Sequence, residues 1–473
     1  MMEGFNFMKK FFVFLLVIFS VLGLSAMSMA KVSVPDEIRI GIYYGSKGAS
    51  SVTLSSDGGL KIGTLDADGE FELIEKVGKG ESITVTKGSS ANSVNVSGIG
   101  EIGDKNNVPY FMSGKNSSGL YLISINGTKY RGDVEIKRYS DSDMTVINVL
   151  SMQEYLYGVV PREIGGNSPI EAVKAQAIIA RTYAAKNYNK RSRWGFNLYP
   201  TVDDQAYGGY TWENSNSNNA VDETDGMVAT YDGELIGGYY FSTSGGYTEN
   251  SENVWGGTLD YLKAVPDTYE PENLTKKTWK VTLTASEVKS LLASRGINVG
   301  DIVDLVPTEF SDVGRVTELK IVGTNGTEYL TKEKTRTYLG LDSQWYTINS
   351  DAPQAVEYIA EENTNSTKRN DTKNDRTDIY KNGDDEEEEE EKEKVVKPLL
   401  QKLLAIFTPA KEDTTEVQTA YAAKTAKTEF VIQGRGWGHA VGMSQNGAIG
   451  MARNDFDCEE IIKWYYSGVK IQK

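Results

Sequence analysis

The stretch from residue 151 to 188, "SMQEYLYGVVPREIGGNSPIEAVKAQAIIARTYAAKNY", organises the region around it. Ser151 and Glu154 have the spacing of an N-terminal capping box, in which each side chain bonds the other's backbone N–H. A short helix is therefore expected to begin after Ser151. Pro161 disfavours helical geometry in the residue before it, so this first helix is expected to end there.

A second and longer helix follows in the same stretch. Ser168 has the side chain of an N-cap, Pro169 suits a first helical position, and Glu171 completes a second capping-box spacing. The helix is expected to pack closely against its neighbours, because small or β-branched residues recur at helical spacing along one face. These residues are Val173, Ala177, Ala180 and Ala184.

Glu163 lies in the short link between the two helices, before the flexible pair Gly165 and Gly166. It has two interpretations: a solvated charge at a helix end, or a carboxyl group placed to move a proton. A nearby cation would lower its pKa and burial would raise it, and a general acid requires the effect of burial to dominate. Arg181 on the second helix is either in a surface ion pair or within reach of Glu163 or a substrate anion.

Composition excludes several classes of function. The chain has 473 residues, which suggests two or three domains. Its formal net charge is -16, so we expect no nucleic-acid partner, because phosphate binding needs a basic surface. Cys458 is the only cysteine and His439 the only histidine. Intramolecular disulfides, multi-cysteine zinc sites and two-histidine metal motifs are therefore impossible, and we expect neither a metal nor a cofactor.

The N-terminus has the pattern of an export signal. Lys9 and Lys10 precede an apolar run over 11–24, and small residues near Ala30 suit a cleavage site. Residues 1–30 are expected to be a signal peptide, or else an uncleaved anchor that would be the chain's only contact with a membrane. Either alternative places the remainder outside the cytoplasm, at the cell wall or the outer face of the cytoplasmic membrane of a Gram-positive-type bacterium.

The next hundred residues predict strands. Short alternating runs separated by glycine and asparagine turns fill 34–134, which is expected to be a small β-rich region. The runs are "IRIGIYY", "SVTLSS", "LKIGTL", "FELIEKV", "SITVTK", "YLISING" and "DVEIKRY". Together with the helices that follow, they predict an α+β chain, β-rich and with a few short helices.

The composition changes sharply at 351–427, which contains eight consecutive acidic residues and is expected to be a disordered linker. An apolar island within it, 395–407, is either a spacer or a short docking helix. Residues 428–473 are again typical of a folded segment, with Asp457 and Glu460 in capping-box spacing. That tail is too short to fold alone, so it is expected to pack onto 135–350 and complete one domain.

Two further stretches are candidates for a binding site. "QGRGWGHAVGMSQNG", residues 433–447, has glycines that allow close approach of a ligand, and His439 in it is either a turn residue or a site residue. "STSGGYTENSENVW", residues 242–255, contains Ser242 and Ser244 beside two glycines but lacks the Gly-x-Ser-x-Gly arrangement of a nucleophile. Cys458 opens a helix, but a structural role suits it better than a reactive one.

These motifs together resemble the SpoIID/LytB family. In chain order the resemblance rests on "EYLYGVVPREI", "SPIEAVKAQAIIARTYA", "DDQAYGG", "STSGGYTENSENVWGG", "GRVTELKIVG" and "GRGWGHAVGMSQNGA". It covers roughly 135–350 and 428–473. The ordered set is specific, although no single motif is.

The resemblance implies a SpoIID-type catalytic domain that acts as a peptidoglycan lytic transglycosylase in sporulation or wall remodelling. Such an enzyme cleaves the bond between N-acetylmuramic acid and N-acetylglucosamine and leaves a 1,6-anhydro end. Glu163 matches the glutamate of the family's "P-x-E" motif and Arg181 the arginine of "A-x-R-T-Y". Other motif positions would line the groove for the glycan strand: Gln205, Tyr207, Ser242, Ser244, His439 and Gln445.

The implied reaction needs a single carboxyl group, unlike the paired carboxylates of most glycoside hydrolases. Glu163 would have to start protonated, so a raised pKa is expected. Some relatives carry cysteine and histidine before the "Q-x-Y-G" motif and bind zinc; here Asp203 and Asp204 stand there, and no zinc is expected. The alternative function is a non-catalytic amidase enhancer that binds peptidoglycan and assists a separate cell-wall hydrolase.

Overall fold

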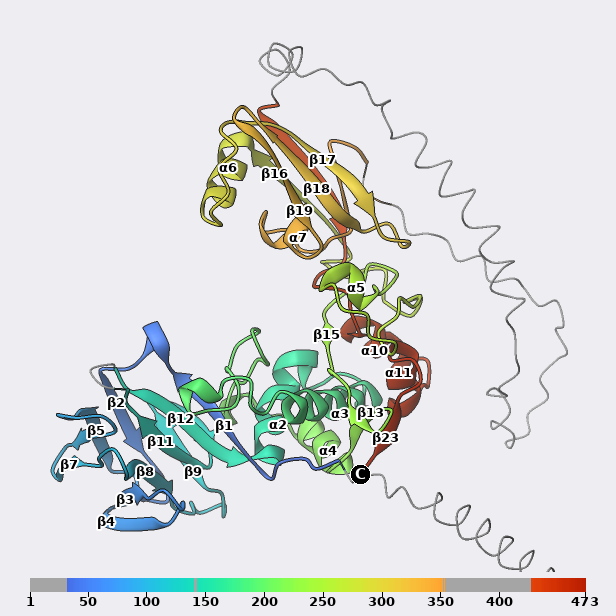
Figure 1. Cartoon of the computed structure of the whole chain (residues 1–473). Coiled ribbons are helices and arrows are strands. Elements are labelled where there is room, and N and C mark those ends of the chain that lie inside the picture. Colours follow the sequence, from blue (N-terminus) through green and yellow to red (C-terminus); the bar gives the residue numbers. More distant parts are fainter. Residues whose placement is uncertain (1–31, 140–142, 352, 354–426) are drawn as a thin grey trace, which may run out of the picture.

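A computed structural model describes residues 32–139, 143–351, 353 and 427–473 (Figure 1). The expected leader at 1–30, the apolar island and nearly all of the expected linker at 351–427 lie outside this part of the chain. Within it, no helix combines the length and apolar character needed to cross a membrane. The mixture of several sheets with a few short helices confirms the expected α+β class.

The N-terminal part is built from two six-stranded sheets that share one apolar core. The sheet orders are β1-β12-β11-β8-β3-β4 and β10-β9-β2-β5-β6-β7. Apolar side chains from both sheets meet in this core, with Val85, Phe111 and Val134 fully buried. The strand bounds are β1 (Glu37–Tyr43), β2 (Ser51–Ser55), β3 (Leu60–Leu65), β4 (Phe71–Val77), β5 (Ser82–Lys87), β6 (Val94–Val96), β7 (Gly100–Ile102), β8 (Val108–Ser113), β9 (Leu122–Ile125), β10 (Thr128–Arg131), β11 (Asp133–Lys137) and β12 (Thr145–Ser151).

This unit extends past the boundary expected at residue 134. That boundary falls inside β11, and β12 pairs antiparallel with both β11 and β1. Because β12 ends at Ser151, the residue that caps the first helix, the sheet leads directly into the helical part of the molecule.

The central part is a group of helices around α3 (Ile170–Lys186), whose small-residue face is fully buried as expected. Its neighbours are α2 (Met152–Val160), α4 (Ser215–Glu223), α10 (Gln445–Ala452) and α11 (Cys458–Tyr465) (Figure 1). The capping boxes expected at Ser151 and Asp457 are both present. The box expected at Ser168 is wrong, because Pro169 is the N-cap and the Ser168 hydroxyl donates to the Ile164 carbonyl instead.

The C-terminal segment folds back onto the preceding region, as expected from its short length. It adds β21 (Glu429–Arg435) between β16 and β20, β22 (Met443–Ser444) beside β15 (Tyr240–Phe241), and β23 (Lys470–Gln472) beside β13. The strands β13 (Val228–Tyr231) and β14 (Glu234–Leu235) form an antiparallel hairpin. Segments far apart in the sequence therefore share three sheets.

The remaining part holds two three-stranded sheets, β16-β21-β20 and β17-β18-β19, around a further core that includes Leu319 and Phe430. Figure 1 shows it as a separate lobe beyond α5 (Ser251–Val254). The bounds are β16 (Thr278–Thr284), α6 (Ala285–Ala293), β17 (Ile302–Phe310), β18 (Val316–Gly323), β19 (Gly326–Thr331), α7 (Lys334–Thr337) and β20 (Tyr346–Ile348).

Candidate active site

Glu163 lies on a single π-helical turn, η2 (Pro161–Gly165), that continues directly from α2. Pro161 has no N–H to donate to the preceding turn, so the regular hydrogen-bond ladder of α2 cannot continue through it. Wider turns of this kind recur at functional sites. The turn leaves Glu163 half-buried between the exposed Arg162 and the buried Ile164.

Three donors from distant parts of the chain hold the Glu163 carboxyl group. The backbone N–H of Ala206 donates to Oε1 at 2.6 Å, and the side chains of Tyr240 and Gln445 also bond the carboxyl group. Tyr240 begins β15 and Gln445 begins α10, and these neighbours are brought together by the parallel pairing of β15 with β22. The carboxyl group is therefore fixed in orientation by three separate segments.

Burial raises the pKa of Glu163, as the general-acid interpretation requires. The three hydrogen bonds and the nearby Arg162 guanidinium act in the opposite direction, but the effect of desolvation dominates. In the described part of the chain, the strongest influences on this pKa include no second carboxylate. The site thus offers a carboxyl group that keeps its proton to higher pH than a free glutamate.

Gln205 is a buried residue that contacts Tyr240, one of the donors to Glu163. Its side chain is fully buried and donates to the Tyr240 hydroxyl at 3.2 Å and to the Ala180 carbonyl at 3.3 Å. It accepts from the Tyr155 hydroxyl at 3.2 Å. Gln205 was expected to line a groove, but its burial makes it a residue that positions Tyr240 instead.

Gln445 also contacts α3. Its amide donates to Gln176 Oε1 at 3.3 Å, while the Nε2 atom of the fully buried Gln176 has no hydrogen-bond partner among the described residues. Of the expected groove residues, Gln445 is the one that contacts Glu163 directly. It also ties the C-terminal segment to the helix that follows the acid.

Arg181 lies elsewhere, which corrects its expected place beside the glycan. Its guanidinium is 1 % exposed and donates to the carbonyls of Met227 at 3.0 Å and Val221 at 3.2 Å, and to the Gln153 side chain at 3.4 Å. Gln153 stands at the start of α2 and Glu163 after its end, roughly 15 Å away at the usual helical rise. Burial lowers the pKa of Arg181 to about 10.

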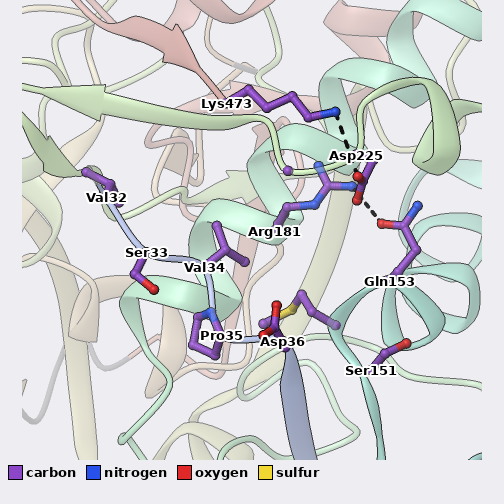
Figure 2. Close-up of a pocket in the computed structure, with 12 residues that line it drawn as sticks. Val32, Ser33, Val34, Pro35, Asp36, Ser151, Gln153, Arg181, Asp225 and Lys473 are labelled. Carbon is purple, nitrogen blue, oxygen red and sulfur yellow. Dashed lines mark hydrogen bonds and ion pairs between the residues drawn. The ribbon is translucent and has the colours of Figure 1, made fainter.

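Figure 2 shows Arg181 at a cavity of 650 Å³. The cavity is lined by residues 32–36, the start of α2, Asp225, Gly226 and Lys473, and none of the groups that bond Glu163 lines it. Arg181 therefore serves to satisfy carbonyl groups between α2, α3, α4 and β13.

Replacing Arg181 by methionine is expected to lower the free energy of unfolding by about 2–4 kcal/mol, because buried carbonyls lose a charged donor. The affinity of the folded protein for glycan strands is expected to stay unchanged. Urea unfolding and a glycan-binding assay would measure the two effects. Lys186→Met, at the exposed end of the same helix, is the control. Weaker glycan binding at unchanged stability would contradict this prediction and would show that Arg181 contacts the glycan.

Two other expected groove residues are interior. Tyr207 is 7 % exposed and donates from its hydroxyl to Asn148 Oδ1 on β12 at 2.8 Å. Ser244 is fully buried, and its Oγ accepts from the Gly246 N–H. Ser242 is half-buried beside Asn446, whose amide donates to the Ser242 carbonyl at 3.0 Å. Of these three, only Ser242 has the exposure that contact with a substrate requires.

His439 is half-buried and packs between aromatic rings. Its ring centroid lies 5.0 Å from that of Trp255 and 5.5 Å from that of Phe241, and its Nδ1 accepts from the Val441 N–H. Burial lowers the pKa of His439 to about 3, so the imidazole is neutral at physiological pH. It also hydrogen-bonds the backbone of Tyr240 and thereby supports the strand that carries this tyrosine.

The sequence did not point to Tyr240, Tyr155 or Gln176 as neighbours of the acid. The only signal for Tyr240 was its place just before residues 242–248, the serine-glycine loop. Burial raises the pKa of Cys458 to about 12, which agrees with a structural thiol.

Asp204, which precedes the "Q-x-Y-G" motif where some relatives bind zinc, is an ion-paired carboxylate. Asp204 accepts from Lys190 Nζ at 2.8 Å and from Arg191 Nε at 2.9 Å. Across the described ranges, no three histidine, cysteine or acidic side chains are grouped so that they could hold a metal ion.

Comparisons with known proteins identify a family model and several relatives. Residues 140–231, which include Glu163, match the family model for the stage II sporulation protein, SpoIID. An uncharacterized protein of Brachyspira hyodysenteriae is 30% identical over 353 residues, which cover 74% of each chain. The stage II sporulation protein D of Bacillus subtilis is 27% identical over 361 residues, 72% of this chain and 79% of the relative.

A third relative carries the other name of the family. The amidase enhancer of Bacillus subtilis is 26% identical over 377 residues, which cover 76% of this chain but only 46% of that longer protein. The family model, these relatives and the ordered motifs agree, and the chain belongs to the SpoIID/LytB family.

Proposed function

We propose that the protein is a peptidoglycan lytic transglycosylase, with Glu163 as its catalytic acid, and that it acts in sporulation or cell-wall remodelling. The observation that carries the proposal is the raised pKa of a half-buried, firmly oriented carboxyl group with no second carboxylate among its strongest influences in the described residues. The names of its relatives, a sporulation protein and an amidase enhancer, support a role at the cell wall.

The reaction can run through this one group. Protonated Glu163 would donate its proton to the glycosidic oxygen as the bond to C1 of N-acetylmuramic acid breaks. The C6 hydroxyl of the same sugar would attack C1, and its proton would return to the Glu163 carboxylate. No water is consumed, so a single acid that later acts as a base suffices. Between the two proton transfers, the carboxylate would be stabilised by hydrogen bonds from the Ala206 N–H, Tyr240 and Gln445.

Analysis of the products by mass spectrometry tests the proposal. Purified glycan strands, with and without stem peptides, would be incubated with the exported chain from residue 31 onward. Anhydro-muramic ends, one water lighter than the reducing ends left by a hydrolase, are expected. Reducing ends would show a hydrolase, and the absence of both would contradict enzymatic cleavage.

A second candidate is a non-catalytic enhancer of a cell-wall amidase. It is favoured by the three donors to Glu163, since hydrogen bonds to a carboxyl group stabilise its ionised form and oppose the role of an acid. The amidase enhancer among the relatives points the same way. Faster digestion of walls by an added amidase, with no anhydro ends, would support this candidate.

The wider organisation follows from either candidate. The protein would be exported by residues 1–30 and would bind glycan strands through a domain formed by 135–350 and 428–473. The region 34–134 would be a module for the wall or for a hydrolase partner, and 351–427 an acidic linker. We propose no cofactor, no metal and no nucleic acid in this activity.

Replacing Tyr240 by phenylalanine is expected to raise the pKa of Glu163 further, because one donor to the carboxylate is lost. A general acid works only while protonated, so activity falls as pH rises through that pKa. In Tyr240→Phe this fall would move to higher pH. The pH profile of kcat/KM measures the shift, with the adjacent Tyr239→Phe as control. If the pH at which kcat/KM falls stayed the same or moved lower, the assignment of Glu163 as the general acid would be contradicted.

A further inference from the structure

A short parallel ladder positions two of the three donors to Glu163. The strands β15 and β22 contain two residues each and pair in parallel. Tyr240 bonds the acid from the first strand, and Gln445, which directly follows β22, bonds it from the second. A ladder of this length has room for very few backbone hydrogen bonds, so its alignment depends on contacts beyond its ends.

Glu270 joins the two chain segments at one end of this ladder. Its Oε1 accepts from the Ser244 N–H at 2.7 Å and its Oε2 from the Gly245 N–H at 2.9 Å, both in the serine-glycine loop that follows β15. The Ser444 hydroxyl, on β22, also donates to Oε1, at 3.3 Å. One carboxyl group therefore bonds both the loop after β15 and the residue that directly precedes Gln445.

Ser444 connects these contacts to α10. It is fully buried and is the N-cap of this helix, where its Oγ accepts from the Gly447 N–H at 3.1 Å. The first turn is tightly packed, because a Cβ added at Gly447 would lie 2.1 Å from Asp267 Oδ1, which itself accepts from the Tyr465 hydroxyl at 2.8 Å. Because the turn is capped and packed in this way, a displacement of Ser444 would also displace the adjoining Gln445.

A carboxyl group at this position reduces stability at neutral pH. Glu270 is 3 % exposed, and burial, followed by the charge of Asp267, raises its pKa to about 7. The two backbone N–H groups and Lys277 oppose this rise. The folded protein therefore loses stability as pH rises from the ordinary glutamate pKa to about 7. Groups with strongly shifted pKa values concentrate at functional sites, which favours a role for Glu270 beyond holding the fold.

We propose that Glu270 is a positioning residue for Glu163. It holds the serine-glycine loop and β22 together at one end of the ladder. Through the ladder it keeps Tyr240 and Gln445 within hydrogen-bond reach of the acid. Among the described residues Glu270 makes no hydrogen bond to Glu163, and it takes no part in the proton transfer. The inference rests on the proposed function for the importance that it gives to Glu163.

Hydrogen exchange in the full exported chain tests the contacts of Glu270. Glu270→Gln keeps the size of the side chain and one acceptor oxygen, but its NH2 group faces a backbone N–H from which it cannot accept. The amides of Ser244 and Gly245 are then expected to exchange about tenfold faster than in the wild type. Glu270→Asp, which keeps the charge on a shorter side chain, should give a smaller increase. Glu234→Gln, at an exposed glutamate of β14, is the control and should exchange as the wild type does.

Titration of the Glu163 carboxyl group, followed by carbon NMR, tests the effect on the acid. In Glu270→Gln the donors Tyr240 and Gln445 lose their alignment, so the pKa of Glu163 is expected to rise further. Loss of the Glu270 charge alone would lower this pKa, so the direction of the change distinguishes the two effects. In a Tyr240→Phe background the rise should be smaller, because one of the two donors is already missing.

Two results would overturn the inference: unchanged exchange at Ser244 and Gly245 in Glu270→Gln, or a Glu163 pKa that stays the same or falls. If Glu270→Gln does not fold, Glu270→Asp decides by the same two readouts. The proposed function fails separately, because neither readout requires cleavage. A raised Glu163 pKa without anhydro ends would overturn only the cleavage, whereas anhydro ends with an unchanged Glu163 pKa would overturn only the role of Glu270.

Discussion

Replacing Glu163 by glutamine is expected to lower the rate of formation of anhydro ends roughly 100- to 10,000-fold. The amide has the same shape, and its carbonyl oxygen can still accept the Ala206 N–H. It has no acidic proton for the glycosidic oxygen and cannot later act as a base. Counting anhydro ends over time by mass spectrometry measures the loss. Glu223→Gln, at an exposed carboxylate paired with Lys174 on the same group of helices, is the matched control.

The same variant is not expected to lose stability. The folded protein holds the Glu163 proton more tightly than the unfolded chain does, because burial raises the pKa. The stability of the wild type therefore falls as pH rises from the ordinary glutamate pKa through the raised one. Glu163→Gln has no such titration, so its stability relative to the wild type should rise across this pH range.

The activity prediction has its own contradicting outcome. If Glu163→Gln kept its activity within tenfold of the wild type, the proton would have to come from another group.

Replacing Arg315 by methionine is expected to lower the free energy of unfolding by about 3–5 kcal/mol. Arg315 is 1 % exposed, and its guanidinium lies 4.7 Å from the ring centroid of Trp345. It donates to three carbonyls of the serine-glycine loop, those of Ser244 at 2.9 Å, Tyr247 at 2.6 Å and Thr248 at 3.1 Å. Methionine would leave these carbonyls without their charged donor and the buried Glu249 carboxylate without its nearest cation.

Denaturant unfolding followed by tryptophan fluorescence measures this loss. Arg295→Met is the control, because Arg295 is exposed and its guanidinium carbon lies 5.5 Å from the ring centroid of Tyr338. It should change stability by less than about 0.5 kcal/mol. A change below about 1 kcal/mol in Arg315→Met would show that the loop carbonyls find other donors.

Local signals in the sequence predicted most of the elements correctly. Alternation identified strands such as β3 and β5, because one face of each sheet is buried against the other sheet. Capping-box spacing located the starts of α2 and α11, where both hydrogen bonds of each box are present. It failed at Ser168, because the preceding π-helical turn offers the Ile164 carbonyl to the same hydroxyl. The spacing of residues in a sequence does not reveal that an irregular turn will place another acceptor, here the Ile164 carbonyl, beside the capping hydroxyl.

The site was less predictable than the fold. Glu163 and its raised pKa were expected, but Tyr240 and Gln176 were not, because their contacts depend on pairing between segments far apart in the chain. Arg181 can be buried because it donates to the carbonyls of Val221 and Met227. Both carbonyls belong to other elements, so a helical wheel of α3 alone does not reveal them. Periodicity identifies which face of an element is buried, but it does not identify the polar groups that meet that face.

The backward folding of residues 427–473 makes the site depend on the order of synthesis. Gln445, which holds Glu163, and β22, which aligns Tyr240, both leave the ribosome after every other group that bonds the acid. A chain that terminates early therefore carries Glu163 without two of the constraints that orient it. Completion of translation is therefore a condition for the full set of contacts that orient the acid.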